Sequence, residues 1–305
     1  MSENQPRNVA ASVKQRLMNY AREKGDDFNA LLNRYAMERL LFRLSSSSHA
    51  GDFYLKGAML FLLWENQSHR PTKDLDLLCI PHYDQEALSK VFQGVISIEV
   101  MDDGLAFDPK SLSVEKIREE NAYGGLRVKL NSYLGEGRIP MQIDVGLGDS
   151  VYPATDWAEF PVLLGFAPPR IRAYPAETVI AEKFQAIVDL KFRNSRMKDY
   201  YDIHYLLQNF SFNGYDLHEA IRQTFERRKT EIPQTVPAGL SSDFATDPNK
   251  QTQWNAFLRK NRLDAVGDLP AVITQIANFL TPVFTDTEVP GKRWTPDKGW
   301  ALCKW

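Results

Sequence analysis

The chain has 305 residues, 43% of them hydrophobic and 25% charged, so it can bury the core of one large domain or of two modest ones. A net charge of −2 and an isoelectric point of about 6.2 argue against a general nucleic-acid binder, although they are compatible with a local basic groove. Two cysteines are too few for a disulfide framework, the first residues lack the apolar core of a signal peptide, and the longest apolar run is too short to span a bilayer. We therefore expect a cytoplasmic protein with no membrane partner.

The first half of the chain predicts helices followed by a mixed sheet. In chain order the predicted elements are helices at 8–24 and 27–45, a strand at 52–55, a helix at 58–65, a strand at 74–80, a helix at 84–93, and strands at 96–101, 126–134 and 139–147. The last two strands flank Gly135-Glu136-Gly137, which is a hairpin signal. Helices that precede a run of strands are typical of the α+β class, which we expect here.

The second half is predominantly helical. Its predicted helices are at 177–191, 197–208, 215–228, 249–259 and 269–279, with a loop at 230–248. Pro282, Pro290 and Pro296 interrupt the last part, so we expect an irregular tail. Pro168-Pro169 marks a boundary. The sequence thus predicts an N-terminal domain of residues 1–165 and a mostly helical C-terminal domain of residues 166–305.

Two carboxylates stand two residues apart in the strand that is predicted to begin at residue 74. A strand directs residues i and i+2 to one face, so Asp74 and Asp76 lie on the same side, about 7 Å apart, while Leu75 and Leu77 suit a core. Two such carboxylates repel each other unless a hard cation sits between them, and Mg²⁺ with nucleotide phosphates is the usual case. The alternative is an acidic pair that caps a turn or faces water.

Asp144 adds a third carboxylate in a later strand. Its neighbours at positions 141, 143 and 145 are apolar and suit the core, so Asp144 faces the opposite side, as Asp74 and Asp76 do. Three strand carboxylates on one sheet face are compatible with a two-metal site that clamps the attacking and leaving oxygens of an in-line displacement. The pattern predicts metal-dependent nucleotidyl transfer, with Mg²⁺ or Mn²⁺ as the cofactor.

Lys56-Gly57-Ala58 stands between a predicted strand and a predicted helix. A tight turn of this kind can present backbone N–H groups to a phosphate, and Lys56 adds a positive charge there. An ordinary β-to-α turn with a surface lysine is the alternative.

Lys183 lies within an apolar helical stripe, four residues from both Val179 and Ile187. A lysine in that position needs an anion nearby or a path to water along its stem. In the first case it is a cation for triphosphate oxygens or for a metal-binding carboxylate, and in the second it is a snorkelling surface residue.

Residues 194–202 place several charges near a predicted helix start. Asp199 and Asp202 are three residues apart and Lys198 and Asp202 are four apart, so they are neighbours on a helix. A capped helix start with solvated ion pairs explains them equally well. Basic helical ends at 222–229 and 259–262 are compatible with solvated faces or with the guidance of a phosphate backbone.

Taken in this order, the segments resemble the AbiEii/AbiGii-type toxin family of nucleotidyltransferases. The resemblance is carried by residues 8–13, 34–39, 55–58, 70–76, 142–146, 174–183, 194–199 and 201–202. It implies a polymerase-β-like nucleotidyltransferase core with a helical C-terminal half, and an NTP as substrate. One departure concerns the start of the motif, where the wider superfamily often has Gly-Ser and this chain has Gly57-Ala58. Backbone N–H groups and Lys56 must then hold the phosphate.

The resemblance also implies roles for individual residues. The residues concerned are Asp74, Asp76, Lys183 and Asp202 for catalysis, Lys56, Gly57, Ala58, Arg196 and Lys198 for nucleotide binding, and Asp74, Asp76 and Asp144 for metal binding. Members of the family act as toxins in type IV-style toxin–antitoxin or phage-defence pairs, and some transfer nucleotides to tRNA 3′ ends. A tRNA acceptor and a separately encoded antitoxin are therefore expected.

Two other functions are compatible with the sequence. The acidic isoelectric point mildly favours a protein or a small molecule as the acceptor. A non-catalytic nucleotide-binding module is the second alternative, and the intact Asp74, Asp76, Lys183 and Asp202 argue against it.

Overall fold

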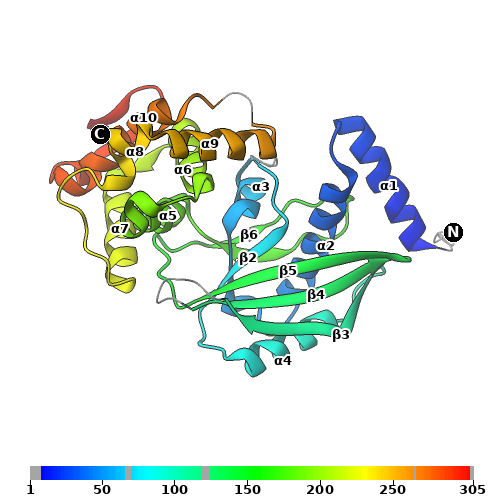
Figure 1. Ribbon diagram of the computed structural model, residues 1–305. Helices are drawn as coiled ribbons and strands as arrows, with labels where there is room; N and C mark the ends of the chain where they lie inside the picture. Colours follow the sequence, from blue (N-terminus) through cyan, green and yellow to red (C-terminus); the bar gives the residue numbers. More distant parts are fainter. Residues whose placement is uncertain (1–7, 66–69, 118–123, 264–265, 303–305) are drawn as a thin grey trace. The chain divides into compact units, whose positions relative to one another are not determined.

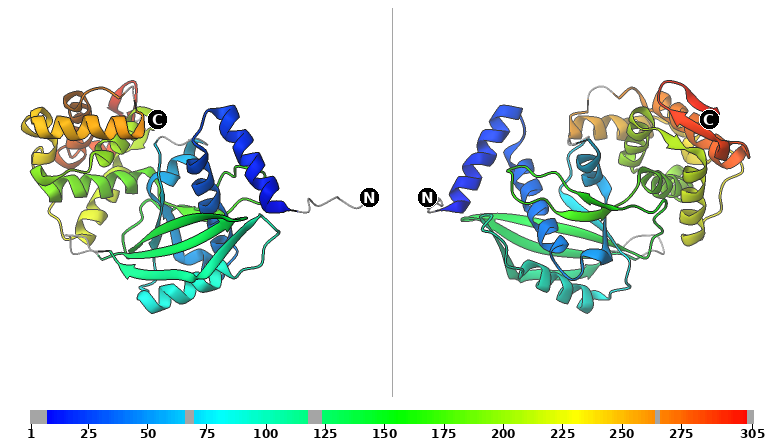
Figure 2. Two further views of the ribbon diagram at one scale, coloured as in Figure 1. Left: turned by 45° about the vertical axis from the view of Figure 1, so that its right-hand side comes forward. Right: turned by 180° about the vertical axis from the view of Figure 1, so that it is seen from behind.

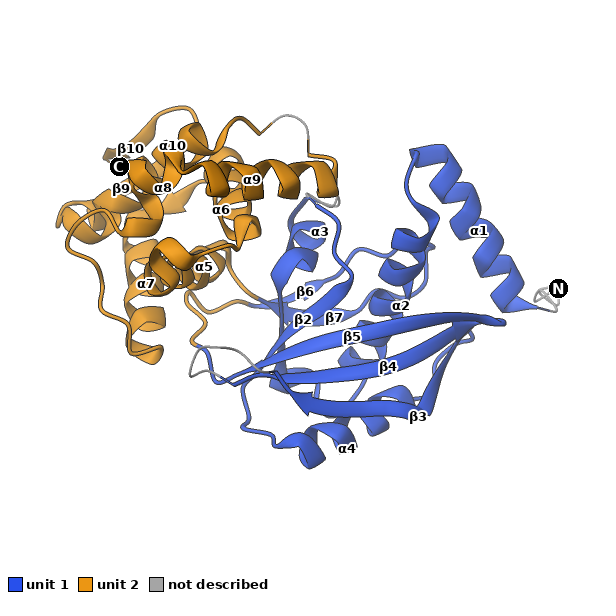
Figure 3. Ribbon diagram, in the orientation of Figure 1, with its two compact units in different colours: residues 1–149, 156–173 blue, residues 150–155, 174–305 orange. Residues whose placement is uncertain are grey.

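The computed structural model describes residues 8–65, 70–117, 124–263 and 266–302. It contains two compact units (Figure 3). Unit 1 consists of residues 1–149 and 156–173, and unit 2 consists of residues 150–155 and 174–305. The predicted boundary after residue 165 falls within the second segment of unit 1, and the assignment of functional domains stays a prediction.

Unit 1 is built on a seven-stranded mixed sheet (Figure 1) with the strand order β3-β4-β5-β2-β1-β7-β6. The strands are β1 (Phe53–Lys56), β2 (Asp74–Cys79), β3 (Leu105–Lys116), β4 (Leu126–Leu134), β5 (Gly137–Leu147), β6 (Trp157–Glu159) and β7 (Arg170–Ala173). β2 is antiparallel to β1 and parallel to β5. The strand that carries the two carboxylates is therefore an interior strand of the sheet.

Helices cover the apolar face of this sheet. The helices of unit 1 are α1 (Val9–Lys24), α2 (Phe28–Ser45), α3 (Leu60–Glu65) and α4 (Gln85–Ile96), with a 3₁₀ turn, η2 (Gly57–Met59), before α3, and of these α2 and α4 pack on that face. α2 packs against β5 and β7, and α4 packs against β3 and α2, so both lie on one side of the sheet (Figure 2). Leu75 and Leu77 of β2 are fully buried on that side. The alternation of leucine and aspartate in β2 thus decides which face meets the helices.

Four elements of unit 1 differ from the sequence prediction, and two of them are the short strands β6 and β7, which were not predicted. The predicted strand at 96–101 is wrong, because α4 extends to Ile96 and buries Val95 with it. β3 has no counterpart among the predicted strands. Asp108 pairs with Asn131 and Ser113 with Lys129, so four residues of β3 face one residue of β4. This bulge interrupts the period of two by which a strand is recognised.

Unit 2 consists mainly of helices. They are α5 (Ala176–Leu190), α6 (Met197–Asn209), α7 (Gly214–Arg227), α8 (Ser242–Thr246), α9 (Pro248–Asn261) and α10 (Leu269–Thr285). The ring of Phe184 packs against those of Phe225 and Phe284, each with its centroid 5.4 Å away. The predicted loop at 230–248 contains α8. In the described part of the chain, no helix is both long enough and apolar enough to cross a membrane.

The predicted irregular tail is wrong over the residues that the structure describes. The tail forms a hairpin that joins a short strand of unit 2 in a three-stranded sheet, and the strands are β8 (Phe212–Asn213), β9 (Lys292–Thr295) and β10 (Gly299–Leu302). The ring of Trp300 stacks on Phe279 with the centroids 5.7 Å apart, and Trp294 packs against the same ring at 4.8 Å. Aromatic packing on a distant helix orders this proline-containing segment, and local sequence does not reveal it.

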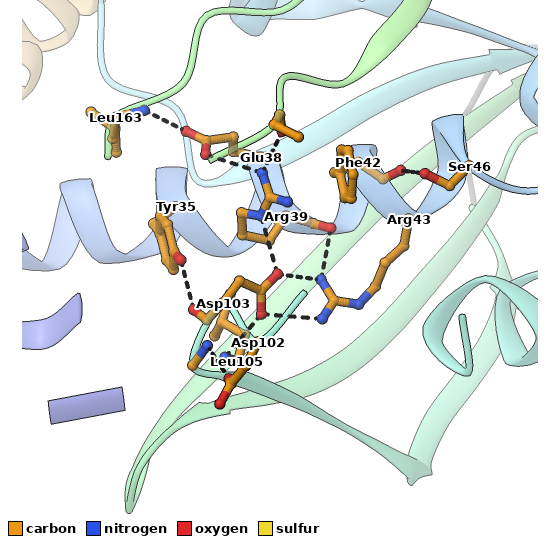
Figure 4. Close-up of polar contacts among 12 residues, drawn as sticks. Tyr35, Glu38, Arg39, Phe42, Arg43, Ser46, Asp102, Asp103, Leu105 and Leu163 are labelled. Carbon is orange, nitrogen blue, oxygen red and sulfur yellow. Dashed lines mark hydrogen bonds and ion pairs between the residues drawn. The ribbon is translucent and has the colours of Figure 1, made fainter. Parts of the chain in front are cut away.

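A buried ion network ties α2 to the rest of unit 1 (Figure 4). The carboxylate of Asp103, 1% exposed, accepts hydrogen bonds from Arg39 Nε at 3.1 Å and from Arg43 Nη1 at 2.7 Å. The buried carboxylate of Glu38 accepts one from the backbone N–H of Leu163 at 2.9 Å. These bonds join α2 to the segment before β3 and to the segment after β6. Loss of the Asp103 carboxylate would leave the buried charges of Arg39 and Arg43 without this partner, and breaking a buried ion pair typically costs about 3–5 kcal/mol of stability.

The pH dependence of stability should report on Glu38. Burial raises the pKa of its carboxyl group to about 7, although the Leu163 N–H group and Arg39 favour the ionised form. The folded state therefore binds the proton more tightly than the unfolded state, in which the pKa is near 4.5. The contribution of Glu38 to stability is largest below the unfolded pKa and is lost as the pH rises through the folded one.

Glu38→Gln should remove this loss of stability. The amide oxygen can still accept the hydrogen bond from Leu163, and the side chain has no charge to desolvate. We expect the variant to be more stable than the wild type by roughly 1–3 kcal/mol at about pH 8, and by much less at about pH 5. Denaturant unfolding at the two pH values measures the difference. Glu86→Gln, at an exposed position of α4, is the control. An unchanged pH dependence in Glu38→Gln would contradict the prediction.

Candidate active site

Four charged residues form one row across four neighbouring strands of unit 1. Asp76 of β2 pairs in register with Lys56 of β1 on one side and with Asp144 of β5 on the other. Asp144 in turn pairs with Arg127 of β4. Residues paired in this way project to the same face of a sheet, with neighbouring Cβ atoms about 4.5–5.5 Å apart. The row therefore places two carboxylates between two cations, on the face opposite the buried leucines of β2.

Asp74 shares this face, two residues before Asp76. It pairs in register with Gln142 of β5, and both β2 carboxylates are half-buried. The predicted common face of Asp74, Asp76 and Asp144 is confirmed. Their roles in catalysis stay predictions.

Gly57 allows the Asp76 carboxylate to lie directly against the backbone. Its φ is +74°, and a Cβ atom at this position would lie 2.0 Å from Asp76 Oδ2. An L side chain fits neither the conformation nor the space. The turn after β1 thus brings the backbone at Gly57 and Ala58 beside the carboxylates. Lys56, the residue before the turn, has its Nζ atom 3.6 Å from Asp149 Oδ2.

Arg127 is the partner of Asp144 that the sequence analysis missed. Its Nε atom donates a hydrogen bond to Asp144 Oδ1 and its Nη2 atom donates one to Asp144 Oδ2, each at 2.8 Å. This bidentate pair raises the pKa of Arg127. The predicted hairpin already implied this pair. If the two strands pair from Leu134 and Gly137 at the turn, counting back along one strand and forward along the other brings positions 127 and 144 opposite each other.

The donor set of unit 1 fits a divalent metal ion in part. Asp74 and Asp76 offer hard oxygen ligands on one face, which suits Mg²⁺ or Mn²⁺. Both oxygens of Asp144 are engaged by Arg127. Within the described ranges, no group of three or more His, Cys, Asp or Glu side chains is arranged to hold a metal ion. Asp74 and Asp76 are thus the residues that fit, and metal binding by Asp144 stays a prediction that requires Arg127 to release the carboxylate.

A second charged cluster, in unit 2, surrounds Lys183 of α5. Its Nζ atom lies 2.9 Å from Asp199 Oδ1 and 2.7 Å from Asp202 Oδ2, both on α6. The Lys183 side chain is 14% exposed and the two carboxylates are 0% and 1% exposed. Lys183 is therefore a largely buried, ion-paired residue and not a snorkelling one. The structure brings together Lys183 and Asp202, as the sequence predicts, and adds Asp199.

Asp199 is held in its ionised form. Burial by itself raises the pKa of this carboxyl group, but Lys183 and Arg196 outweigh that effect and lower the pKa below its ordinary value. Arg196 Nε lies 2.6 Å from Asp199 Oδ2. The spacing of Asp199 and Asp202 on one helix face was visible in the sequence, yet the family resemblance assigned a role to Asp202 alone.

The remaining predicted residues of unit 2 are at the start of α6. Arg196 is the N-cap residue, and its side chain is 45% exposed while it pairs with Asp199. Lys198 is exposed in the first turn. The nucleotide-binding roles of both residues, and of Lys56, Gly57 and Ala58 in unit 1, stay predictions.

The family described as "Nucleotidyl transferase AbiEii toxin, Type IV TA system" matches residues 39–272, which is well over half of the chain. The chain belongs to this family. It is therefore a nucleotidyltransferase of the AbiEii type, and the predicted α+β fold with a polymerase-β-like nucleotidyltransferase core is confirmed.

Two solved structures are similar to this AbiEii-family chain at low identity. A proposed nucleotidyltransferase from H. pylori is 18% identical, covers 84% of this chain and 94% of its own, and has a TM-score of 0.44. JHP933 from Helicobacter pylori is 17% identical, covers 84% of this chain and 91% of its own, and has a TM-score of 0.43. A comparison with curated proteins gave no match. Family membership rests on the family match, and no residue role is taken from the two structures.

Gly57→Ala should impair nucleotidyl transfer without unfolding the protein. The added methyl group must displace the Asp76 carboxylate, and a displacement of about 1 Å can reduce a rate roughly a hundredfold. Gly51→Ala is the matched control, because a Cβ atom there meets nothing within 4 Å and φ is not in the left-handed region. Transfer of label from an NTP measures the effect, and circular dichroism checks the fold. Equal activity of the two variants would contradict this role of Gly57.

Proposed function

We propose that this protein is a divalent-metal-dependent nucleotidyltransferase toxin that transfers nucleotides from an NTP to an RNA acceptor, namely the 3′ end of tRNA. The observation that carries most weight is the row of Lys56, Asp76 and Asp144 across three strands, with Gly57 packed against Asp76. This arrangement combines hard metal ligands, a cation and a close backbone approach, which together suit a nucleoside triphosphate.

Each group of unit 1 has a separate task in this proposal. A bound Mg²⁺ or Mn²⁺ supplies charge neutralisation at the transferring phosphate. Asp74 and Asp76 hold the ion, and Lys56 with the backbone of Gly57 and Ala58 binds phosphate oxygens. In the transfer itself, the acceptor hydroxyl oxygen bonds to the α-phosphorus of the NTP. The bond from this phosphorus to the bridging oxygen breaks, pyrophosphate leaves with the electron pair, and the hydroxyl proton passes to a base.

Lys183 and Asp202 serve the same reaction in this proposal. Three cations and two carboxylates stand at the cluster, namely Lys183, Arg196, Lys198, Asp199 and Asp202. The cluster thus carries a formal charge of +1 (three minus two). A positively charged group of this kind suits the triphosphate, and the two buried carboxylates fix the direction of the Lys183 ammonium.

The acceptor and the partner are proposed from the family. Its description as a type IV toxin–antitoxin family supports a separately encoded antitoxin. Of the two basic segments, the one at 222–229 is partly neutralised, since Arg222 pairs with Glu219 at 2.7 Å and with Glu226 at 2.8 Å. The segment at 259–262 has exposed basic side chains at the end of α9. It is the better candidate for contact with RNA phosphates.

The acceptor can be identified by labelling. Purified protein incubated with each radiolabelled NTP and with total RNA or total protein should transfer label to RNA, and tRNA should carry most of it. Asp74→Asn should reduce transfer roughly a thousandfold, because loss of one metal ligand costs several kcal/mol of transition-state stabilisation. Expression of the wild type alone should stop growth, whereas the Asp74→Asn form should not.

Two results would count against this function. Label on protein and not on RNA, from a harmless wild type, would favour nucleotidylation of a protein. Near-normal transfer by Asp74→Asn would remove Asp74 from the metal site.

Lys183→Ala should weaken both NTP binding and transfer. The substitution removes the ammonium between the Asp199 and Asp202 carboxylates and lowers the formal charge of the cluster from +1 to zero. Lys191→Ala, at an exposed position directly after the same helix, is the control. Titration of the protein with a labelled NTP measures affinity, and a loss of about tenfold or more is expected for Lys183→Ala alone. Equal affinities for the two variants would mean that the Lys183 cluster has only a structural role.

A further inference from the structure

A cavity of about 480 Å³ lies beside Asp74 in unit 1. Its lining residues are Asn33, Lys73, Asp74, Ser111, Lys129, Leu130, Asn131, Pro140, Met141 and Gln142. This volume is within the range of about 300–1,000 Å³ that is usual for small-ligand sites. A single nucleotide is a ligand of that size class.

The polar lining side chains of β2, β4 and β5 project from the same sheet face as the carboxylates, while Asn33 comes from α2. Gln142 pairs in register with both Asp74 and Lys129, and Asn131 pairs with Pro140, so these side chains project to one side. The bulge in β3 shapes the far wall, where Ser111 Oγ accepts a hydrogen bond of 2.8 Å from the backbone N–H of Asn131.

Several polar groups of the cavity are available to a ligand. In the described part of the chain, the side-chain amides of Asn33, Asn131 and Gln142 have no hydrogen-bond partner. Lys73 is exposed and pairs with no carboxylate there. Lys129 pairs with Glu115 at 2.6 Å, but both side chains are 50% exposed, so this pair can open at little cost. Amides that can donate and accept, next to two lysines, match the base edges and the phosphates of a nucleotide.

The strand order places this cavity and the Gly57 turn on opposite sides of β2. The Gly57 turn, where the NTP phosphates are proposed to bind, follows β1, and β1 is next to β2 on one side. The cavity extends over β5 and β4, which are next to β2 on the other side. The carboxylates of β2 therefore lie between the two. In an in-line displacement the attacking and leaving groups stand on opposite sides of the transferring phosphorus.

We propose that this cavity binds the terminal nucleotide of the single-stranded RNA acceptor, in an inference that rests on the proposed RNA-directed function. Asn131 and Gln142 contact the base, and Lys73 and Lys129 contact the adjoining phosphates. Asp74, at the edge of the cavity, is next to the hydroxyl group that attacks.

The kinetic test separates acceptor binding from NTP binding. Asn131→Ala and Gln142→Ala should each raise the KM for an RNA acceptor about tenfold and leave the KM for the NTP unchanged. Gln93→Ala, at an exposed position of α4, is the control and should change neither value. Circular dichroism of each variant checks that the fold is retained.

The binding test needs no catalysis. A short single-stranded oligoribonucleotide should bind the wild type without NTP, with an affinity that falls as salt rises. Lys129→Ala should lower the slope of log affinity against log salt by about 0.7, as expected for one lost phosphate contact of a single strand. Lys116→Ala, at the exposed end of β3, should leave the slope unchanged. A 4-thiouridine at the 3′ end of the same RNA should crosslink to peptides from β4 and β5.

The possible failures are distinguishable. If the wild type labels RNA but the cavity variants keep the acceptor KM of the Gln93→Ala control, the acceptor site is overturned and the proposed function stands. If the KM for the NTP rises instead, the cavity is a nucleotide-donor site and the inference is wrong. If the wild type labels protein alone and the oligoribonucleotide does not crosslink, both the inference and the RNA-directed function fall.

Discussion

The register of β2 between β1 and β5 is the constraint on which the candidate active site depends. In this register Lys56, Asp76 and Asp144 are direct neighbours, and Leu75 and Leu77 face the helices. A slip of one residue would send every side chain of β2 to the other face, so the carboxylates would enter the core and the leucines would face water. The cost of burying two carboxylates keeps the strand in place. The same apolar packing that stabilises unit 1 therefore also positions the polar groups.

Charge balance explains how the carboxylates are tolerated so close together. Arg127 engages both oxygens of Asp144, and Lys56 stands on the other side of Asp76. Gly57 then admits Asp76 against the backbone, where no other residue fits. The site thus depends on the neighbouring cations, on the turn at Gly57 and on the alternation of side chains between the two faces of each strand. In the proposed function, Asp74 and Asp76 are the carboxylates that hold the divalent ion.

Buried ion clusters recur in both units, and each joins elements that are distant in sequence. In unit 1, Asp103 connects two arginines of α2 to the segment before β3. In unit 2, Lys183 connects α5 to two aspartates of α6. Such clusters are expensive to desolvate, so each is tolerated only while its partners keep the short distances and precise geometry that compensate the buried charges. For Lys183 this precision also directs an ammonium group, as the proposed contact with a triphosphate requires.

Local patterns in the sequence determined most of the helices, the strands β1, β2, β4 and β5, the common face of Asp74, Asp76 and Asp144, and the presence of Lys183 in an apolar stripe. They could do so because the face of a strand or helix depends only on periodicity. The tertiary structure alone decided the β3 bulge, the hairpin that Trp294 and Trp300 order, the second partner of Lys183 and the cavity beside Asp74. Each of these depends on contacts between segments far apart in the chain, and the energy of such contacts is absent from any local pattern.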